Sequence, residues 1–367
     1  MTLKEIDIFN FKNIGSARLD FTPGVNALLG NNGMGKSNLL EAIHLLCMAR
    51  PMHTLPDNAL INHEADAMMV KGNFLTDTGG DDEISCGIAK GKGKKMKRNG
   101  KEYTRLSEHI GRYPVVTVTP DDHKLVTGAG EERRKLMDMV ISQADASYLT
   151  SLIRYTRSLE SRNRMLRAGV KDNLLYESIE NVMEENAAAI HKSRAQWVER
   201  MAPVVENIYS RLAGKAEPVS MSYRSQLNGT TLNKLLDERR QKDMVLGYTS
   251  GGIHRDDLEI TLDSHSLRSL GSQGQLKTFT VALRLAIFDF LKQEKGITPL
   301  LLLDDIFDKL DASRVENIMK EVTTPGIFGQ IFITDTNRKH LDDILSGMSG
   351  SSMLINVENG NFNPLTL

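Results

Sequence analysis

The segment at residues 30–37, GNNGMGKS, carries the residue types that a phosphate-binding loop requires. It fits the pattern G-x-x-x-x-G-K-[ST], in which glycines let backbone N–H groups close around a phosphate. We expect Lys36 to reach the β- and γ-phosphates of a nucleotide and Ser37 to ligate Mg²⁺. The predicted nucleotide contacts are Gly30, Asn31, Asn32, Gly33, Met34, Gly35, Lys36, Ser37 and Asn38. The motif alone leaves a kinase, a GTPase or a plain glycine turn open.

Two adjacent acids follow four leucines in the segment LLLLDDIFDKLD, residues 300–311. Strands buried on both faces of a parallel sheet are continuous apolar runs, and their carboxyl ends meet at the ligand-binding edge. We therefore expect Asp304 to hold Mg²⁺, directly or through water, and Asp305 to polarise an attacking water. Alone, the segment also fits a core strand with a solvated acidic end. Together with Lys36, it predicts ATP hydrolysis in which Lys36 and Asp305 are catalytic.

A third segment, SLGSQGQLK at residues 269–277, precedes an apolar helix and the acidic strand. Ser272, together with the N–H groups of Gln273 and Gly274 at a helix start, would form a second anion site. Such a site suits a γ-phosphate held by another subunit across a two-fold axis. A simple serine N-cap is the alternative.

The elements around these motifs are predicted from their apolar periodicity. Residues 1–30 alternate apolar and polar residues and end in VNALLG, which favours strands. From Lys36 to Arg50, apolar residues recur at helical spacing until Pro51. The loop therefore lies between a strand and a helix, and the helix N-terminus adds its positive end to the phosphate site.

The middle of the chain combines two patterns. Residues 70–118 are β-rich, and the Asn99-Gly100 pair favours a hairpin turn. Between 130 and 214 the spacing predicts two long antiparallel helices, separated at Gly169 and ended by Gly214. Their apolar faces are predicted to consist of Leu149, Leu152, Leu159 and Leu166, and of Leu175, Ile179, Val182, Trp197, Met201 and Ile208. From residue 243 onward strands return, the last predicted one at 330–334.

Composition limits the classes of protein that remain. The 367 residues are 40% hydrophobic and 25% charged, which is enough for roughly two globular domains. Lys and Arg total 46 against 47 Asp and Glu, so nucleic-acid binding would need a local basic patch. The sequence has no signal-peptide or membrane-spanning pattern, which predicts a cytoplasmic protein without membrane contact. Cys47 and Cys86 fit packing in a reducing compartment.

The motif order resembles that of ATP-binding-cassette (ABC) ATPases, in which the signature of one subunit covers the ATP of the other. By this resemblance Ser272, Gln273, Gly274 and Gln275 act in trans, and Asp308 and Asp311 belong to the D-loop at the dimer interface. The chain also resembles the RecF family over nearly its whole length. The segments that carry this resemblance are IDIFNFKNI, GNNGMGKSNLLEAI, TPDDHKLVTGAGEERRKLMD, YTRSLESRNRMLR, GGIHRDDLEI and GSQGQLK.

The resemblance implies an α/β fold. An ABC-type ATPase head, with a P-loop NTPase sheet and a β-rich subdomain, would contain an inserted helical arm. The expected parts are 1–125 with the P-loop, 126–242 as the arm, and 243–367 with the signature, the acidic strand and the D-loop. Between Lys36 and Ser272 lie enough residues for a short arm, but too few for the long coiled coils of SMC proteins.

The resemblance also implies a function. RecF proteins are ATP-dependent DNA-binding dimers with weak ATPase activity, and they use ATP and Mg²⁺. They act with RecR and RecO to load recombinase at single-strand gaps, in DNA replication, recombinational repair and the SOS response. The expected DNA is duplex and single-strand/duplex junctions.

Three positions depart from the family pattern. The segment ITDTN, 333–337, offers no histidine as a γ-phosphate switch, so the group that senses hydrolysis stays open. Ile253 stands where a proline is usual before His254, and His123 replaces a usual leucine. Neither Ile253 nor His123 belongs to the expected chemistry.

Two basic segments are candidates for DNA contact. The predicted hairpin carries Lys90, Lys92, Lys94, Lys95, Lys97, Arg98 and Lys101, of which Lys92, Lys94, Lys95, Lys97 and Arg98 are preferred. Phosphate contacts there would make binding salt-dependent, although lysines also protect exposed sheet edges. The arm carries Arg154, Arg157, Arg162, Arg164 and Arg167, which could equally be solvated. Aromatic residues are only 5%, which favours duplex backbone contact over base stacking.

Two other classes stay open. A phosphotransferase such as a kinase would need an acceptor-binding lid and gives no reason for the Ser272 turn. A non-catalytic DNA-binding scaffold leaves Asp304 and Asp305 unexplained. A dimer that forms with ATP but not with ADP would favour the ABC-type ATPase over both of these classes.

Overall fold

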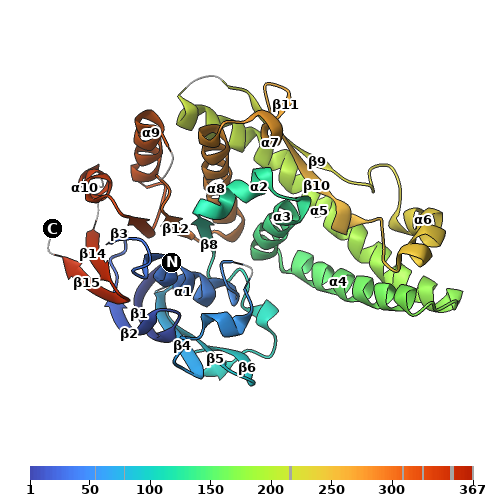
Figure 1. Ribbon diagram of the computed structural model, residues 1–367, viewed down its shortest axis with the longest axis horizontal. Coiled ribbons are helices and arrows are strands. Elements are labelled where there is room, and N and C mark those ends of the chain that lie inside the picture. The colour runs from blue at the N-terminus through green and yellow to red at the C-terminus, as the bar shows by residue number, and fades with distance from the viewer. Residues whose placement is uncertain are drawn as a thin grey trace. The chain divides into compact units, whose positions relative to one another are not determined.

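The computed structural model describes residues 1–53, 55–77, 79–214, 217–307, 310–324, 326–347 and 351–365. The chain divides into two compact units (Figure 1). Unit 1 consists of Met1–Asp122, Arg211–Gly214 and Val281–Leu367, and unit 2 of His123–Ser210 and Lys215–Thr280. The expected boundaries after residues 125 and 242 stay a prediction.

The first sheet of unit 1 has six strands in the order β15-β14-β3-β13-β12-β8. Its strands are β3 Val25–Leu29, β8 Val115–Val118, β12 Leu300–Asp304, β13 Ile331–Asp335, β14 Ser352–Glu358 and β15 Asn361–Leu365. All neighbours pair in parallel except the edge strand β15. Strand β12 is buried along its whole length between two parallel neighbours, which confirms the expectation for the four leucines. Strands β14 and β15 were not predicted.

The second sheet of unit 1 is antiparallel, in the order β2-β1-β4-β5-β6-β7. Its strands are β1 Thr2–Phe11, β2 Ile14–Asp20, β4 Ala67–Leu75, β5 Asp81–Ala89, β6 Gly93–Arg98 and β7 Lys101–Glu102. Between β6 and β7, Asn99 and Gly100 have φ angles of 51° and 77°. Two positive φ angles are what a tight two-residue hairpin requires, so the predicted turn is confirmed.

Helix α1 (Lys36–Met48) lies between these two sheets. It contacts β1, β4 and β5 of one sheet and β8, β12 and β13 of the other, and nearly all of its residues are buried. The remaining elements of unit 1 include η1 Asp57–Leu60, η2 Leu106–Glu108, η3 Pro120–His123, α9 Ala312–Thr323 and α10 Arg338–Gly347. Helix α10 packs on β3 and β13. The strand, loop and helix order predicted around Lys36 is therefore confirmed.

Unit 2 combines long helices with a small antiparallel sheet of order β11-β10-β9. Its helices are α2 Lys124–Thr127, α3 Gly130–Ala144, α4 Ala146–Arg167, α5 Asn173–Ala213, α6 Leu232–Leu246, α7 Leu267–Leu270 and α8 Gln273–Lys295. Helix α5 belongs to unit 2 up to Ser210, and α8 up to Thr280. The strands are β9 Val219–Arg224, β10 Asp257–Leu262 and β11 His265–Ser266, with η4 at Ile253–Arg255. Gly169 and Gly214, with φ angles of 64° and 67°, end α4 and α5 as predicted.

Helices α4 and α5 run antiparallel side by side (Figure 1). Tyr148 at the start of α4 accepts from Arg194 of α5, whereas Arg162 near the end of α4 donates to Glu180 near the start of α5. This order of contacts shows that the two helices are antiparallel. The predicted apolar faces were partly wrong. Leu175 and Val182 are 44% and 42% exposed. Leu166, Trp197, Met201 and Ile208 are buried as predicted. Other buried positions of these helices hold tyrosines and charged residues of a polar network, which apolar periodicity does not detect.

The two cysteines are buried and free, as their expected packing role requires. Burial raises the pKa of the Cys47 thiol well above its usual range and that of Cys86 to about 12. Neither thiol is therefore a reactive thiolate at neutral pH. Among the helices that the structure describes, none is long and apolar enough to cross a membrane.

Candidate nucleotide site and basic surfaces

The loop between β3 and α1 depends on three glycines. Gly33 and Gly35 have φ angles of 81° and 114°, a region that residues with side chains rarely adopt. A Cβ on Gly30 would lie 2.4 Å from the carbonyl oxygen of Val357, because β14 packs directly against the loop. Backbone conformation and close packing thus explain why glycine stands at these positions.

The Lys36 ammonium is held over this loop. Its Nζ donates to the carbonyl oxygens of Gly30 at 2.6 Å and Asn31 at 3.1 Å, and the residue is only 4% exposed. Both carbonyls belong to the predicted phosphate-binding segment. The structure therefore places one cation inside a ring of loop backbone, as a phosphate site requires.

Asn13 supports the loop from the turn between β1 and β2. Its Nδ2 donates to the Gly33 carbonyl at 3.1 Å, and its Oδ1 accepts from Asn38 Nδ2 at 2.7 Å. On the other side, the Gly360 N–H donates to the Met34 carbonyl at 2.8 Å. Sequence reasoning missed Asn13 and Gly360, since nothing in the local pattern links either to the loop.

Strand β12 brings Asp304 to the start of α1. Ser37 Oγ donates to Asp304 Oδ1 at 2.8 Å across 267 positions of the chain, and Thr334 Oγ1 donates to the same oxygen at 2.8 Å. Burial raises the pKa of the Asp304 carboxyl, and the two hydroxyl hydrogen bonds oppose that shift. Two residues predicted to hold Mg²⁺ are thus in direct contact.

The oxygen atoms of Ser37 and Asp304 fit Mg²⁺, which binds through one or two carboxylates and completes its shell with water and substrate phosphates. Within the described ranges, no three His, Cys, Asp or Glu side chains form a cluster that could hold a metal by themselves.

Asp305 has an unusual backbone conformation at the carboxyl end of β12. Its φ angle is 44°, in the left-handed region that non-glycine residues seldom occupy. Its N–H donates to Thr334 Oγ1 at 3.0 Å, so this one hydroxyl contacts both acids. Asp305 lines a cavity of about 430 Å³ together with Asn32, Pro120, Phe307, Asp335, Thr336, Asn337 and His340. The cavity thus joins the loop to the predicted water-activating acid.

His340 is the histidine of this cavity. Its Nδ1 lies 2.8 Å from Asp335 Oδ2, and the Phe307 ring packs against it edge-on at 5.4 Å. Sequence reasoning searched residues 333–337 for a histidine and missed this one, which lies in the first turn of α10. Asp335 fixes the orientation of the imidazole, because a carboxylate on one ring nitrogen determines which way the other points.

The predicted signature lies at the N-terminus of α8. Ser272 Oγ accepts from the Gln275 N–H at 3.2 Å, and Gln275 Oε1 accepts from the Ser272 N–H at 2.9 Å. This reciprocal pair is a capping box, which the sequence left open as the simpler alternative. Ser272 and Gln273 are exposed, and Gln275 Nε2 also donates to Glu217 Oε1 at 3.2 Å. The role of Ser272, Gln273, Gly274 and Gln275 in trans stays a prediction.

The predicted D-loop is only partly described. Asp308 lies outside the described residues. Asp311 is the N-cap of α9, where its carboxylate accepts from the Arg314 N–H at 2.9 Å and from Ser313 Oγ at 2.7 Å. Its contacts are thus local, and its role at a dimer interface stays a prediction.

A family model described as "RecF/RecN/SMC N terminal domain" matches residues 2–353. A protein of Parabacteroides distasonis named "DNA replication and repair protein RecF" is 46% identical over 365 residues, covering 100% of both chains. The chain belongs to the RecF family. A relative of the same name from Porphyromonas gingivalis is 45% identical over 98% of this chain and 99% of its own.

Solved structures agree with the RecF assignment. A structure described as "the recombination mediator protein RecF-ATP in RecFOR pathway" matches with a TM-score of 0.88 at 29% identity, covering 99% of this chain and 97% of that one. The Smc head domain of Pyrococcus furiosus matches with a TM-score of 0.59 at 17% identity, covering 100% of this chain and 96% of that one, which shows the fold alone. The predicted RecF resemblance and the α/β fold with an ABC-type head are confirmed.

The basic hairpin of this RecF family member is largely neutralised by acids. Four of its seven basic residues are paired with carboxylates: Lys90 with Asp66 at 3.1 Å, Lys94 with Asp57 at 2.9 Å, Lys95 with Glu102 at 3.4 Å, and Arg98 with Asp82 at 3.0 Å. Lys92, Lys97 and Lys101 are exposed, and the described residues give them no ion pair. DNA contact by the hairpin stays a prediction. Fewer positive charges are available for it than the sequence suggests.

The pair of Arg98 with Asp82 is the firmest in the hairpin. Arg98 donates through Nε and Nη2 to the two carboxylate oxygens at 3.1 and 3.0 Å, and the Tyr113 hydroxyl donates to the same group at 2.8 Å. Burial alone would raise the pKa of Asp82, but hydrogen bonds from Arg98, Tyr113 and Asn99 outweigh it and hold the pKa below its usual value. Arg98 therefore anchors the hairpin to β5.

The arginines of the arm fall into two classes. Arg162 is completely buried, where it donates to Glu180 at 2.8 Å, Asp243 at 2.8 Å and Thr249 at 2.9 Å. Its inclusion among the possible DNA contacts was wrong, because it is the centre of a buried ion network. The other arginines of this set, Arg154, Arg157, Arg164 and Arg167, are exposed.

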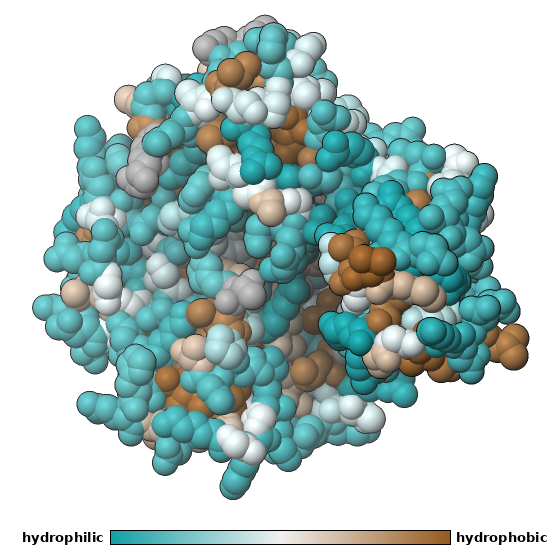
Figure 2. Space-filling view, turned by 45° about the vertical axis from the view of Figure 1, so that its right-hand side comes forward, coloured by the Kyte–Doolittle hydropathy of each residue, from teal (hydrophilic) through white to brown (hydrophobic). Residues whose placement is uncertain are grey.

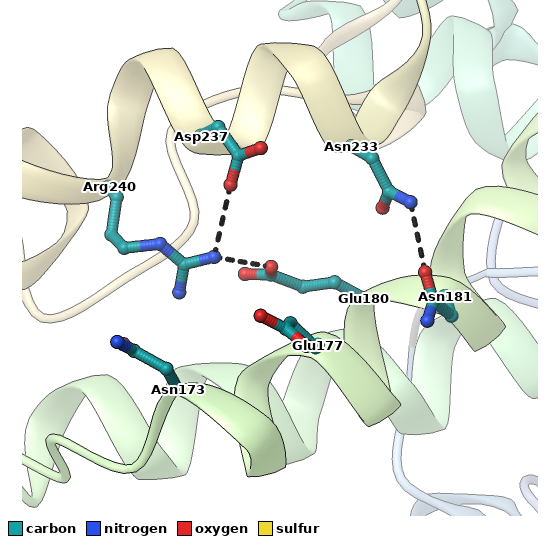
Figure 3. A pocket seen from close by; sticks show the side chains of 7 residues that line it. All are labelled: Asn173, Glu177, Glu180, Asn181, Asn233, Asp237 and Arg240. Carbon is teal, nitrogen blue, oxygen red and sulfur yellow. Dashed lines mark hydrogen bonds and ion pairs between the residues drawn. The ribbon is translucent and has the colours of Figure 1, made fainter.

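A polar pocket of unit 2 lies between α5 and α6 (Figure 3). Arg240 of α6 bridges the two helices by donating to Glu180 of α5 at 2.6 Å, and it also donates to Asp237 of its own helix at 3.3 Å. Glu177 points into the same space. Its three carboxylates disfavour phosphate groups, although Glu180 is also paired with Arg162. The pocket therefore gives no support to a nucleotide or DNA backbone site.

Proposed function

We propose that the protein is an ATP-dependent DNA-binding ATPase of the RecF type that dimerises around ATP. One observation carries the ATPase part of the proposal. The hydroxyl of Ser37 and the carboxylate of Asp304 are hydrogen-bonded at 2.8 Å although 267 positions separate them, and Lys36 and Asp305 adjoin them in the chain. A kinase would share this pair, but the exposed turn at Ser272 and the RecF relatives favour the dimeric ATPase.

The side chains divide the chemistry between them. Lys36 supplies positive charge to the terminal phosphates. Ser37 and Asp304 would hold Mg²⁺, which when bound would supply charge neutralisation. Asp305 orients the attacking water from the adjoining cavity, and Thr334 fixes its backbone. His340, oriented by Asp335, is the group of this cavity that is available to contact the γ-phosphate. These roles support hydrolysis of ATP, and the low rate is what the RecF resemblance implies.

The second half of the composite site is the N-terminus of α8. The capping box leaves Ser272 and Gln273 exposed at the positive end of a helix, which suits a phosphate bound by a second copy of the chain. The bound ATP would then contact both subunits and stabilise the dimer by its differential affinity.

The cellular role follows from the relatives. Their names place them in DNA replication and repair, and a solved RecF is described as a recombination mediator in the RecFOR pathway. We propose the same role for this protein, with RecR and RecO as partners, gapped DNA as substrate, and the cytoplasm as its location.

The test is the oligomeric state on a sizing column with ATP, with ADP and without nucleotide. We expect ATP alone to produce a dimer. Ser272→Arg should still bind ATP but stay monomeric, because its side chain fills the space meant for the partner's phosphate. Lys36→Ala should lose ATP affinity.

Mixing the two variants provides the matched control. Each Ser272→Arg subunit brings an intact ATP loop and each Lys36→Ala subunit an intact turn, so one composite site at most should form. A Ser272→Arg subunit that fails to bind ATP as a monomer would show that the turn acts in cis and would contradict the dimer proposal.

A further inference from the structure

Helix α4 presents four arginines to solvent. Arg154, Arg157, Arg164 and Arg167 are exposed, whereas Tyr148, Tyr155, Arg162 and Leu166 are the buried residues of the helix. At 3.6 residues per turn, Arg157 and Arg164 lie opposite the buried line, and Arg154 and Arg167 lie on the two flanks. We call this side the outer face of α4.

The outer face lacks the acids that usually accompany exposed bases on helices. In this protein Lys135 pairs with Glu131 at 2.9 Å, Lys320 with Glu316 at 2.7 Å, and Arg338 with Asp342 at 3.4 Å. Among the described residues, none of the four outer arginines forms an ion pair with an acid.

Glu160 makes this absence informative. It lies three residues after Arg157 and four before Arg164, the spacing at which helical ion pairs form, yet the structure shows no pair with either. Support of the helix by paired charges therefore does not explain the four arginines. Their guanidinium groups remain available to an external anion.

The dimensions of the outer face suit a long polyanion. Arg154 and Arg167 are 13 positions apart, which corresponds to about 20 Å along the helix axis. That length matches the rise of about six base pairs of duplex. One guanidinium group can donate two hydrogen bonds to the oxygens of one phosphate. Several exposed arginines along this length can therefore contact several phosphates of one backbone.

A protein partner fits the outer face less well. Protein interfaces are centred on buried apolar and aromatic side chains. Helix α4 itself exposes no large apolar side chain, although the exposed Met244, Val245 and Leu246 directly precede Gly247, which lies against Arg167. The face of the molecule in Figure 2 is mainly hydrophilic, with apolar side chains in separate small groups.

We propose that the outer face of α4, and not the hairpin, binds the phosphate backbone of DNA. This inference rests on the proposed DNA-binding function and identifies the surface of the protein that contacts DNA. The contacts are charge-assisted hydrogen bonds from Arg154, Arg157, Arg164 and Arg167 to phosphate oxygens, without base recognition.

The experiment compares two variants from which the same number of charges is removed. The arm variant carries Arg157→Gln, Arg164→Gln and Arg167→Gln, and the hairpin variant carries Lys92→Gln, Lys97→Gln and Lys101→Gln. All six residues are exposed and none is in an ion pair of the described structure, so neither variant breaks an ion pair, and the arm variant loses only the hydrogen bond from Arg164 to Ser161. Binding of a fluorescent duplex is measured with ATP at several salt concentrations, together with ATP-driven dimerisation on a sizing column.

We expect the arm variant to dimerise with ATP like the parent. The plot of its log affinity against log salt should become shallower, with the magnitude of the slope reduced by about three for each bound subunit. The hairpin variant should keep the parental slope. An arm variant with the parental slope, or a hairpin variant that loses it, overturns the assignment to α4. A parent that binds no DNA with ATP instead overturns the proposed function itself, so the two failures are distinguishable.

Discussion

The hairpin β6–β7 and the outer face of α4 are both rich in basic residues in sequence, but the fold gives these residues different surroundings. Three hairpin bases pair with Asp57, Asp66 and Asp82, which come from elsewhere in unit 1. The outer arginines of α4 have no such partner in the described structure. Clustered bases in a sequence therefore overstate the charge available to a ligand wherever tertiary structure brings acids to them.

A second contrast lies within α4 itself. Arg162 and Arg164 are two positions apart, yet one is fully buried and the other exposed. The buried arginine joins α4 to Glu180 and Asp243, and the exposed one faces solvent. The same residue type thus serves stability on one side of the helix and, by our proposal, DNA binding on the other.

The largest effect is expected where this contrast is strongest. Arg162→Ala leaves Glu180 and Asp243 as buried carboxylates without their central cation, so it should lower the free energy of unfolding by about 3–5 kcal/mol. Denaturant unfolding of the full chain measures this loss. The matched change Arg157→Ala, on the outer face, should alter stability by less than about 0.5 kcal/mol. Equal losses in the two variants would show that the division of α4 into two faces is wrong.

The sequence could not separate these faces because their difference depends on distant residues. Apolar periodicity placed Leu175 and Val182 inside, whereas the structure buries Tyr176 and Glu180 at neighbouring positions of α5. A buried charge is recognisable only with its partner, and Asp243 lies 81 positions from Arg162. By contrast, the loop glycines, the two long helices and the Asn99-Gly100 turn are local features, and these were predicted.

A smaller effect is expected in the hairpin. Arg98→Gln removes two hydrogen bonds from Asp82, but Arg98 is 40% exposed, so the loss of stability should be about 1 kcal/mol. Its salt-dependent affinity for DNA should match that of the parent. A steep fall in that affinity would indicate that the hairpin, through Arg98, contacts DNA.

The pH dependence of the same variant sharpens this prediction. Because the pKa of Asp82 in the folded protein is below its usual value, its contribution to stability is present above about pH 4 and is lost as the pH falls through the lowered pKa. Without Arg98 the pKa of Asp82 rises. Acid unfolding of Arg98→Gln should therefore begin at a higher pH than that of the parent, and Lys97→Gln should follow the parent. Superimposable acid-unfolding curves of Arg98→Gln and the parent would contradict this account.

The nucleotide site shows the same limit of sequence reasoning. Ser37 and Asp304 were expected to meet, because strand ends of a parallel sheet share one edge, and the structure places them in contact. Thr334 and His340 were not identified, since their importance depends on packing of β13 and α10 beside β12. The sequence thus predicted the acids and the loop, but not the residues that orient them.

The central claim is that ATP held between two subunits controls contact with DNA. Asp305→Asn preserves the shape of the side chain and should retain ATP and Mg²⁺ while removing the chemical step. The decisive measurement is DNA retention by this variant with ATP, with ADP and without nucleotide, over a series of salt concentrations. With ATP, two outer faces of α4 should act on one duplex, so retention should be longest and the salt slope about twice that without nucleotide. Equal retention and equal slopes in all three conditions would contradict the account.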